Sequence, residues 1–258
     1  MLSSLRLAVS LLTRLPTRVE RVDNTTVGRA MTLAPVVGAA LGAVAAAVVA
    51  GASWCVHGET LLPAAIGVTV LTLGTGALHL DGLADTADAL GVRGDADAAR
   101  AAAKAATVGV FGIVAVALSL LLDVTAVATS LGFGRATTAL VTGCSAGRLA
   151  ATWACVSVPA ASATGLGAWV ATTVSRTQAL VASAFLVAVA GITAWLDVRA
   201  VFSVVAIAAV VVALVVGAVV RRIGCRRFGG LTGDVLGAVI ACASTAAYLT
   251  VALTPRAG

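Results

Sequence analysis

The chain has 258 residues, of which 60% are hydrophobic and only 11% charged, and its mean hydropathy of +1.07 excludes an ordinary soluble domain and indicates an integral membrane protein. Its formal net charge is +6, but the arginines lie beside apolar segments without interleaved aromatic residues, which argues against nucleic acid as a partner and favours attraction to an anionic lipid bilayer. The five cysteines form no C-x-x-C pair, so neither a disulfide framework nor a thiolate metal site is expected.

The chain begins with a short apolar run over residues 1–12, followed by a polar, arginine-bearing stretch over residues 14–29. The run is too short to cross a membrane, and no small-residue cleavage site precedes the polar stretch. We therefore predict an amino-terminal amphipathic helix that lies in the membrane interface.

Seven apolar stretches follow, each close to the roughly 20 residues that a helix needs to cross a hydrocarbon core of about 30 Å. They cover residues 31–52, 61–78, 110–129, 137–156, 178–196, 200–220 and 235–253. We predict an all-α, polytopic membrane helix bundle of about seven transmembrane helices, organised as one domain over residues 1–258. Within the first span, Gly38 and Gly42 form a G-x-x-x-G surface that allows close helix packing.

The basic residues are distributed unevenly between the ends of these spans. Cytoplasmic loops carry the excess of Lys and Arg, so the amino terminus is expected in the cytoplasm. With this orientation only Arg135, Arg199 and Arg256 face the exterior, and Arg148 falls within a span.

Residues 79–88 read H-L-D-G-L-A-D-T-A-D, which concentrates acidic residues in a chain that has few charges. Asp81, Asp85 and Asp88 are spaced i, i+4 and i+7, so in a helix they share one face. Because three neighbouring carboxylates repel one another, the spacing indicates a bound divalent cation, and an all-oxygen ligand set favours Mg²⁺. A polar cap on a helix leaving the membrane is the structural alternative. His79 is a substrate-site candidate beside them.

Two further features lie on the predicted cytoplasmic side. Residues 95–104 resemble a solvated helix capped by Asp95, to which we assign no chemistry. Arg148 lies inside the span 137–156, where a charge is costly and usually faces a polar cavity, although snorkelling to the headgroups is the alternative. Phosphate suits its planar guanidinium group.

The last motif, G-G-L-T-G-D-V-L-G at residues 229–237, leads into the final span. Glycines at Gly229, Gly230 and Gly233 leave backbone N–H groups free to approach phosphate, and Thr232 offers a hydroxyl donor. Asp234 is a candidate metal ligand or proton acceptor. Acids, glycine turns and arginines at one membrane face suit transfer of a phosphoryl-linked group.

The chain resembles the cobalamin synthase family, the adenosylcobinamide-GDP ribazoletransferases. The resemblance is carried by T-R-L-P at residues 13–16, the acidic motif at 79–88, G-V-F-G at 109–112, G-R at 147–148 and the glycine motif at 229–237. It implies a Mg²⁺-dependent, multi-pass enzyme of the bacterial cell (inner) membrane whose active site faces the cytoplasm. Its substrates would be adenosylcobinamide-GDP and α-ribazole or α-ribazole 5′-phosphate, and its products adenosylcobalamin, or its 5′-phosphate, and GMP.

The resemblance also implies roles for matching residues. Asp81, Asp85 and Asp88 would hold metal and pyrophosphate, Asp234 would join them or act as the base, and Arg14 and Arg148 would bind phosphate. The chain departs from the family pattern at residues 105–107 and at Ala241, where the resemblance leads us to expect acidic residues. The alternatives are a CDP-alcohol-type lipid phosphotransferase and a small-molecule permease, and the oligomeric state, a homo-oligomer included, stays open.

Overall fold

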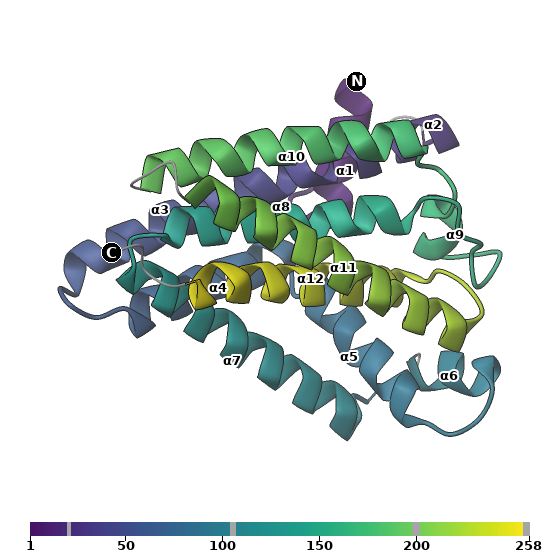
Figure 1. The fold of residues 1–258 in the computed structure, drawn as a ribbon. Coiled ribbons are helices and arrows are strands. Elements are labelled where there is room, and N and C mark those ends of the chain that lie inside the picture. Colours follow the sequence, from purple (N-terminus) through teal and green to yellow (C-terminus); the bar gives the residue numbers. More distant parts are fainter. Residues whose placement is uncertain (20–21, 104–106, 198–201, 255–258) are drawn as a thin grey trace.

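The computed structural model describes residues 1–19, 22–103, 107–197 and 202–254, and over these ranges the chain consists of helices and connecting loops, with no strand (Figure 1). The helices are α1 (Leu2–Leu12), α2 (Asn24–Thr32), α3 (Ala34–Cys55), α4 (Leu61–Thr75), α5 (Leu78–Gly91), α6 (Ala96–Ala103), α7 (Val110–Gly132), α8 (Ala136–Ala154), α9 (Leu166–Val170), α10 (Arg176–Asp197), α11 (Phe202–Phe228) and α12 (Gly233–Leu253). The all-α membrane bundle that the sequence predicts is confirmed.

The number of membrane spans differs from the predicted seven. Within the described residues, α3, α7, α10, α11 and α12 are each long and apolar enough to cross a membrane. The pair α4 and α5 meets the same criterion only when taken together across a bend of 85°, which gives up to six spans. Residues 137–156, the remaining predicted span, correspond to α8, which is not among them.

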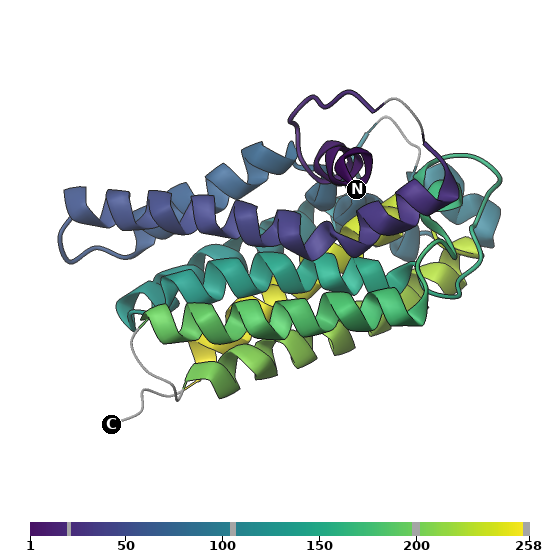
Figure 2. The same cartoon turned by 90° about the horizontal axis from the view of Figure 1, so that it is seen from above.

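Helix α8 lies in the middle of the bundle, packed between α3, α10, α11 and α12 (Figure 2). Nearly all of its residues are buried, among them Thr142, Ser145 and Arg148. A helix that neighbouring helices surround does not need an apolar, lipid-facing side chain at every turn. The polar residues of α8 are therefore consistent with a helix buried within the protein. A hydropathy count does not distinguish such a helix from one that faces lipid.

The G-x-x-x-G surface of α3 packs closely against α8, as predicted. A Cβ atom added to Gly38 would lie 2.6 Å from the carbonyl oxygen of Cys144, and one added to Gly42 would lie 2.5 Å from that of Leu140. The two backbones approach so closely only because these positions have no side chain.

A sharp corner separates α4 from α5. Gly76 and Ala77 both adopt left-handed backbone conformations, with φ values of 63° and 58°. The predicted span 61–78 therefore ends at Thr75, and α5 turns away from the direction of α4, so we treat α5 as lying outside the membrane-spanning segments. The backbone N–H of Arg14 donates to the carbonyl of Gly74 at 2.9 Å, which fixes the chain after α1 to this corner.

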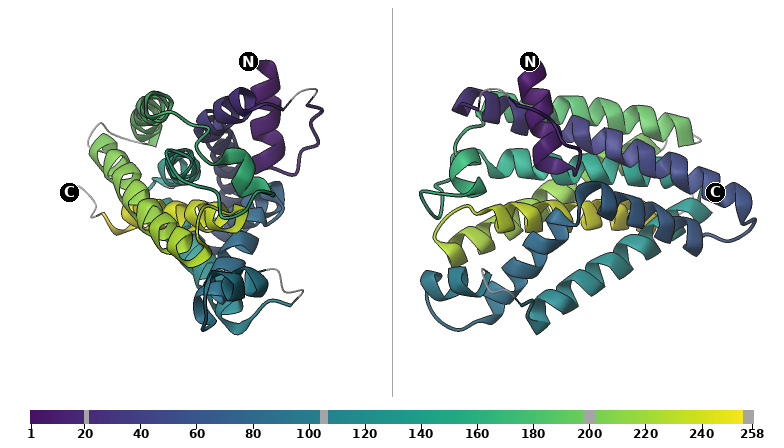
Figure 3. Two further views of the ribbon diagram at one scale, coloured as in Figure 1. Left: turned by 90° about the vertical axis from the view of Figure 1, so that its right-hand side faces the viewer. Right: turned by 180° about the vertical axis from the view of Figure 1, so that it is seen from behind.

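Helix α1 lies across the long helices (Figure 3), as expected for a helix in the membrane interface. One side of it, including Leu7 and Leu12, is buried, whereas Leu2 and Leu5 are exposed. The helical amphipathic segment predicted for residues 1–12 is thus present.

The α3–α8 contact generates a stability prediction. We expect Gly42→Ala to lower the unfolding temperature in detergent, because the added methyl group meets the backbone of Leu140, and overpacking of this kind costs about 1–3 kcal/mol. Gly51→Ala on the same helix is the matched control. No atom lies within 4 Å of its added Cβ, so the higher helix propensity of alanine is expected to stabilise it by about 0.5–1 kcal/mol. Equal shifts in both variants would contradict the proposed packing.

Candidate active site

The acidic motif and the glycine motif meet where α5 crosses the beginning of α12. A Cβ atom added to Gly82 would lie 2.8 Å from the carbonyl oxygen of Asp234 and 3.0 Å from the Cα of Gly237. The reciprocal Cβ on Gly237 would lie 3.1 Å from the Cα of Gly82. The two helices therefore touch through their backbones, glycine against glycine, which brings Asp81 and Asp85 close to Asp234.

The pKa of Asp85 reflects the proximity of these carboxylates. Partial burial, together with repulsion from Asp81, Asp234 and Asp88, raises the pKa of Asp85 from 3.8 to about 6. The acid helix and the start of α12 thus form one electrostatically coupled group. A cation placed among these carboxylates would relieve their repulsion.

Two neighbouring cavities adjoin the acids. Asp81, Gly82, Asp234 and Gly237 line a cavity of about 200 Å³ that also contacts His79 and the end of α1. Asp234 and Gly233 also border a second cavity of about 330 Å³, which is lined by Arg100 and Thr232. Asp234 therefore borders both spaces and Asp81 borders the first, whereas Asp85 lines neither.

Asp88 points elsewhere. Its two carboxylate oxygens accept hydrogen bonds from the backbone N–H groups of Gly109 (2.7 Å) and Gly112 (2.8 Å), at the first turn of α7. A side chain at either glycine would collide with this carboxylate, which explains the G-V-F-G motif. Asp88 anchors α7 to the acid helix, and a carboxylate at a helix amino terminus also complements the helix dipole.

The magnesium site predicted from Asp81, Asp85 and Asp88 is not assembled as a close group. Among the described residues, no cluster of three or more His, Cys, Asp or Glu side chains is placed to hold a metal ion. Residues one turn apart on a helix are separated by roughly 5–6 Å, so their side chains converge only when another element folds over them. Here α12 approaches Asp81 and Asp85, whereas α7 engages Asp88.

The loop before α12 is held in place by backbone contacts. The N–H of Leu231 donates to the carbonyl of Pro159 at 2.8 Å, and the N–H of Ala161 donates to that of Leu231 at 3.1 Å. The Thr232 hydroxyl accepts a hydrogen bond from the N–H of Val235 at 3.1 Å and so caps α12. Gly229 and Gly230, with φ values of 81° and 157°, shape the turn.

Gly229 and Gly230 border a different cavity from the acids. That cavity measures about 440 Å³ and is lined by Arg221, Arg222 and Arg226 of α11. Of the predicted glycine-loop residues, only Thr232 and Gly233 share a cavity with Asp234.

Comparisons with known proteins agree with the motifs. A family model described as cobalamin-5-phosphate synthase matches residues 4–252. The chain belongs to this family. It is 41% identical to the adenosylcobinamide-GDP ribazoletransferase of Frankia casuarinae over 98% of this chain and 96% of the relative, and 38% identical to that of a Nocardioides species over 95% and 96%. No solved structure matches the chain. Membership of the cobalamin-5-phosphate synthase family favours an enzyme of cobalamin biosynthesis over the lipid phosphotransferase and the permease.

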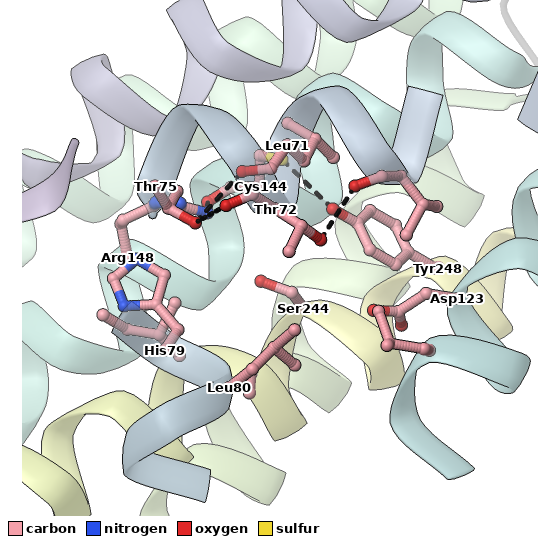
Figure 4. Close-up of a pocket in the computed structure, with 14 residues that line it drawn as sticks. Leu71, Thr72, Thr75, His79, Leu80, Asp123, Cys144, Arg148, Ser244 and Tyr248 are labelled. Carbon is pink, nitrogen blue, oxygen red and sulfur yellow. Dashed lines mark hydrogen bonds between the residues drawn. The ribbon is translucent and has the colours of Figure 1, made fainter. Parts of the chain in front are cut away.

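Of the three other predicted substrate-binding residues, Arg14 lies apart, whereas Arg148 and His79 line one cavity. Arg14 is exposed, with its stem over Gly76 at the corner between α4 and α5. Arg148 and His79 are buried and line a fourth, smaller cavity of about 60 Å³ (Figure 4). His79 borders this cavity and the 200 Å³ acid cavity, so it lies between the two spaces. Burial and the nearby Arg148 guanidinium lower the pKa of His79 well below its ordinary value, so its imidazole is neutral.

Sequence reasoning missed a role for α6. Asp95 caps this helix as predicted, accepting hydrogen bonds from the N–H groups of Asp97 (3.1 Å) and Ala98 (3.0 Å). The helix is not simply solvated, however, because Arg100 donates to the carbonyl of Phe228 at 2.6 Å and lines the cavity of Asp234. The separation of 128 residues between Arg100 and Phe228 leaves no local signal for this contact. Residues 105–106, part of the departure from the family pattern, lie outside the described residues.

Arg227 was also missed, and it holds the far end of the acid helix. Its guanidinium group donates to the carbonyls of Ala89 (2.8 Å), Val92 (2.7 Å), Gly94 (2.7 Å) and Asp95 (2.9 Å). A positive charge at a helix carboxyl terminus satisfies the last carbonyls and complements the dipole. The end of α11 thus fixes the end of α5.

Two variants that each neutralise one carboxylate of α5 are expected to differ in unfolding temperature in metal-free buffer. We expect Asp88→Asn to lower the unfolding temperature, because an amide offers one acceptor oxygen where the carboxylate serves two N–H groups. Asp85→Asn is expected to leave it unchanged or raise it, because this change removes a charge that its neighbours repel. A lower unfolding temperature for Asp85→Asn alone would contradict the assignment.

The contacts of Arg227 predict a loss of stability. Arg227→Gln removes charge-assisted hydrogen bonds that each contribute about 1.5–3 kcal/mol. Because water replaces part of these bonds, the free energy of unfolding is expected to fall by a few kcal/mol in total. Thermal unfolding measures this effect. Arg222→Gln, an exposed position on the same helix, is the control and should unfold like the parent protein.

Proposed function

We propose that this protein transfers the phosphocobinamide group of adenosylcobinamide-GDP to α-ribazole or its 5′-phosphate, forming adenosylcobalamin or its 5′-phosphate and GMP. One observation carries the proposal: the glycine crossing of α5 and α12 turns Asp81 and Asp234 toward one cavity and couples them to Asp85. The family match supplies the substrate class, because the relatives are named adenosylcobinamide-GDP ribazoletransferases.

The reaction is a phosphoryl-group transfer between two oxygens. The ribose hydroxyl of the acceptor attacks the phosphorus atom bound to cobinamide, and the bond from that phosphorus to the oxygen of GMP breaks. Asp234, which borders both cavities, is suited to accept the proton of the hydroxyl group. Arg14 and Arg148 remain candidates for phosphate binding, with Thr232, Gly229, Gly230 and Gly233 as predicted backbone and hydroxyl donors.

The donor set fits magnesium. Asp81, Asp85 and Asp234 offer only carboxylate oxygens, and a divalent cation bound among them would relieve the repulsion that Asp81 and Asp234 exert on Asp85. When bound there, Mg²⁺ would neutralise phosphate oxygens and the charge on the leaving GMP. Asp88, the other predicted ligand, contributes mainly by anchoring α7.

We further propose that the protein resides in the bacterial inner membrane with this site facing the cytoplasm. The support is that Arg100 of α6 and the arginines at the end of α11 lie at the same end of the bundle as the acid helix, whereas the connection between α7 and α8, which contains Arg135, lies at the opposite end (Figure 1). Membranes of anionic lipid and the positive-inside rule favour this orientation.

Release of GMP tests the function. Purified enzyme supplied with adenosylcobinamide-GDP, α-ribazole and Mg²⁺ is expected to release GMP, and Asp81→Asn, Asp85→Asn and Asp234→Asn are each expected to reduce kcat by about 10²-fold or more. Asp23→Asn, which keeps an effective cap on α2, is the matched control and should retain activity.

Two outcomes would contradict the proposal. One is full Mg²⁺-dependent GMP release by Asp85→Asn or Asp234→Asn. The other is an equal Mg²⁺-induced shift of the unfolding temperature in the parent and in Asp81→Asn, which would remove these carboxylates from the metal site.

A further inference from the structure

The 440 Å³ cavity at the end of α11 has no part in the proposed reaction. Arg221, Arg222 and Arg226 of α11 line it on one side, and Pro159, in the segment that follows α8, lines it on another. Arg222 and Arg226 are exposed, and Arg221 is half-buried. We call this space the arginine cavity.

The three positive charges of the arginine cavity are not balanced by acidic side chains. Among the described residues, no carboxylate lines the cavity or forms an ion pair with Arg221, Arg222 or Arg226. Arg222 and Arg226 are one helical turn apart, and like charges at this spacing repel each other. An anion bound between them would relieve the repulsion.

An apolar space continues the arginine cavity along α11. This fifth cavity measures about 170 Å³ and shares Ala218 and Arg221 with the arginine cavity, so the two spaces adjoin. Apart from Arg221 it is lined by uncharged side chains of α8 and α11, namely Ala150, Trp153, Ala154, Leu214, Gly217 and Ala218. We call this space the apolar groove.

The apolar groove is formed by close helix packing. A Cβ atom added to Gly217 would lie 2.7 Å from Cβ of Ala150, so α8 and α11 nearly touch where they line the groove. The indole N–H of Trp153 donates to the Ser183 hydroxyl of α10 at 3.0 Å, which holds the indole ring in place. Ala218 is exposed, so the groove is accessible from outside the bundle.

The two spaces follow α11 in the order of a phospholipid molecule. The arginines lie near the end of the apolar span Val204–Phe228, and the groove residues lie deeper within it. A helix rises about 1.5 Å per residue, so roughly 18 Å of α11 separate Leu214 from Arg226. Half of a hydrocarbon core is about 15 Å thick, so a headgroup at the arginines leaves an acyl chain beside the groove.

We propose that the arginine cavity and the apolar groove together bind one anionic glycerophospholipid. Its phosphodiester group lies in the arginine cavity, where guanidinium groups offer paired N–H donors to phosphate oxygens. One of its acyl chains lies in the apolar groove. Basic pockets beside membrane-spanning helices are suited to anionic headgroups, and the adjoining groove distinguishes a bound lipid from general attraction to a charged bilayer.

A soluble phosphate compound, such as the nucleotide substrate, offers the same phosphate chemistry, but the geometry favours the lipid. Gly229 and Gly230 border the arginine cavity, whereas Gly233 and Asp234 border the 330 Å³ cavity, so the loop before α12 separates the two spaces. The arginine cavity opens into an apolar groove, for which a nucleotide has no matching group. The lipid site is therefore distinct from the candidate active site, and the inference does not depend on the proposed function.

Lipid binding is tested on the delipidated full-length protein in detergent. Phosphatidylglycerol is expected to raise its unfolding temperature, and native mass spectrometry should show one retained molecule, whereas phosphatidylcholine should have neither effect. The double variant Arg222→Gln/Arg226→Gln should need at least tenfold more phosphatidylglycerol for half of the shift. Arg93→Gln/Arg176→Gln, which removes two exposed arginines that line neither space, is the matched control and should behave like the parent. An equal loss in both double variants would indicate general attraction to anionic lipid and overturn the site.

The acyl-chain position is tested without changing the charge. Ala218→Phe places a ring where the two spaces adjoin and is expected to weaken phosphatidylglycerol binding at least tenfold. Val219→Phe alters the next residue, which is also exposed but lines neither space, and should bind like the parent. Equal binding by the two variants would overturn the assignment of the groove to an acyl chain.

Soluble phosphates test the source of the phosphate group. Inorganic phosphate and GMP are each added in place of lipid, and neither is expected to produce a shift in unfolding temperature that depends on Arg222 and Arg226. A shift as large as that with phosphatidylglycerol, lost in the Arg222→Gln/Arg226→Gln variant, would assign the cavity to a soluble phosphate and overturn the lipid site.

Discussion

The candidate site depends on the contact of two glycines, Gly82 of α5 and Gly237 of α12. A side chain at either position would push the helices apart, and the acidic residues on α5 would lose their proximity to Asp234. Helices usually pack with their axes 8–10 Å apart, and only small residues permit closer approach. The contact places like charges together, so it acts against folding unless a cation or a proton compensates. Unfavourable electrostatic repulsion of this kind is typical of functional sites.

The rest of the structure holds the acid helix against that repulsion. At its beginning, the corner at Gly76 and Ala77 turns the chain into α5, and the segment after α1 packs over it. At its end, Arg227 binds four backbone carbonyls, and Asp88 joins the helix to α7. An element fixed at both ends keeps its side chains in place when its charges repel, which is the preorganisation that transfer chemistry requires.

Hydropathy and spacing predicted the helices and located the acids, because both signals are local. The starts of α7 and α12 were predicted to within two residues, and the G-x-x-x-G surface packs as expected. The same signals failed where distant contacts decide. Helix α8 resembled a lipid-facing span although neighbouring helices enclose it, and no local pattern indicated that Asp88 accepts hydrogen bonds from backbone N–H groups 21 and 24 residues away. Arg227 contacts residues more than 130 positions away, so no motif indicated it.

The glycines of the motifs show why the sequence alone predicts only part of the candidate site. Gly229, Gly230 and Gly233 were interpreted as phosphate-binding turn residues, yet of these three only Gly233 borders the cavities of Asp234, whereas Gly229 and Gly230 shape a loop beside another cavity. Gly237, which also lines one cavity of Asp234, permits the helix crossing. Gly109, Gly112 and Gly147 likewise make room for Asp88 and Ser244. In a bundle of apolar helices, polar groups meet only where backbones approach closely. The glycines therefore mark the places where charges are brought together, and the charged residues beside them carry the chemistry.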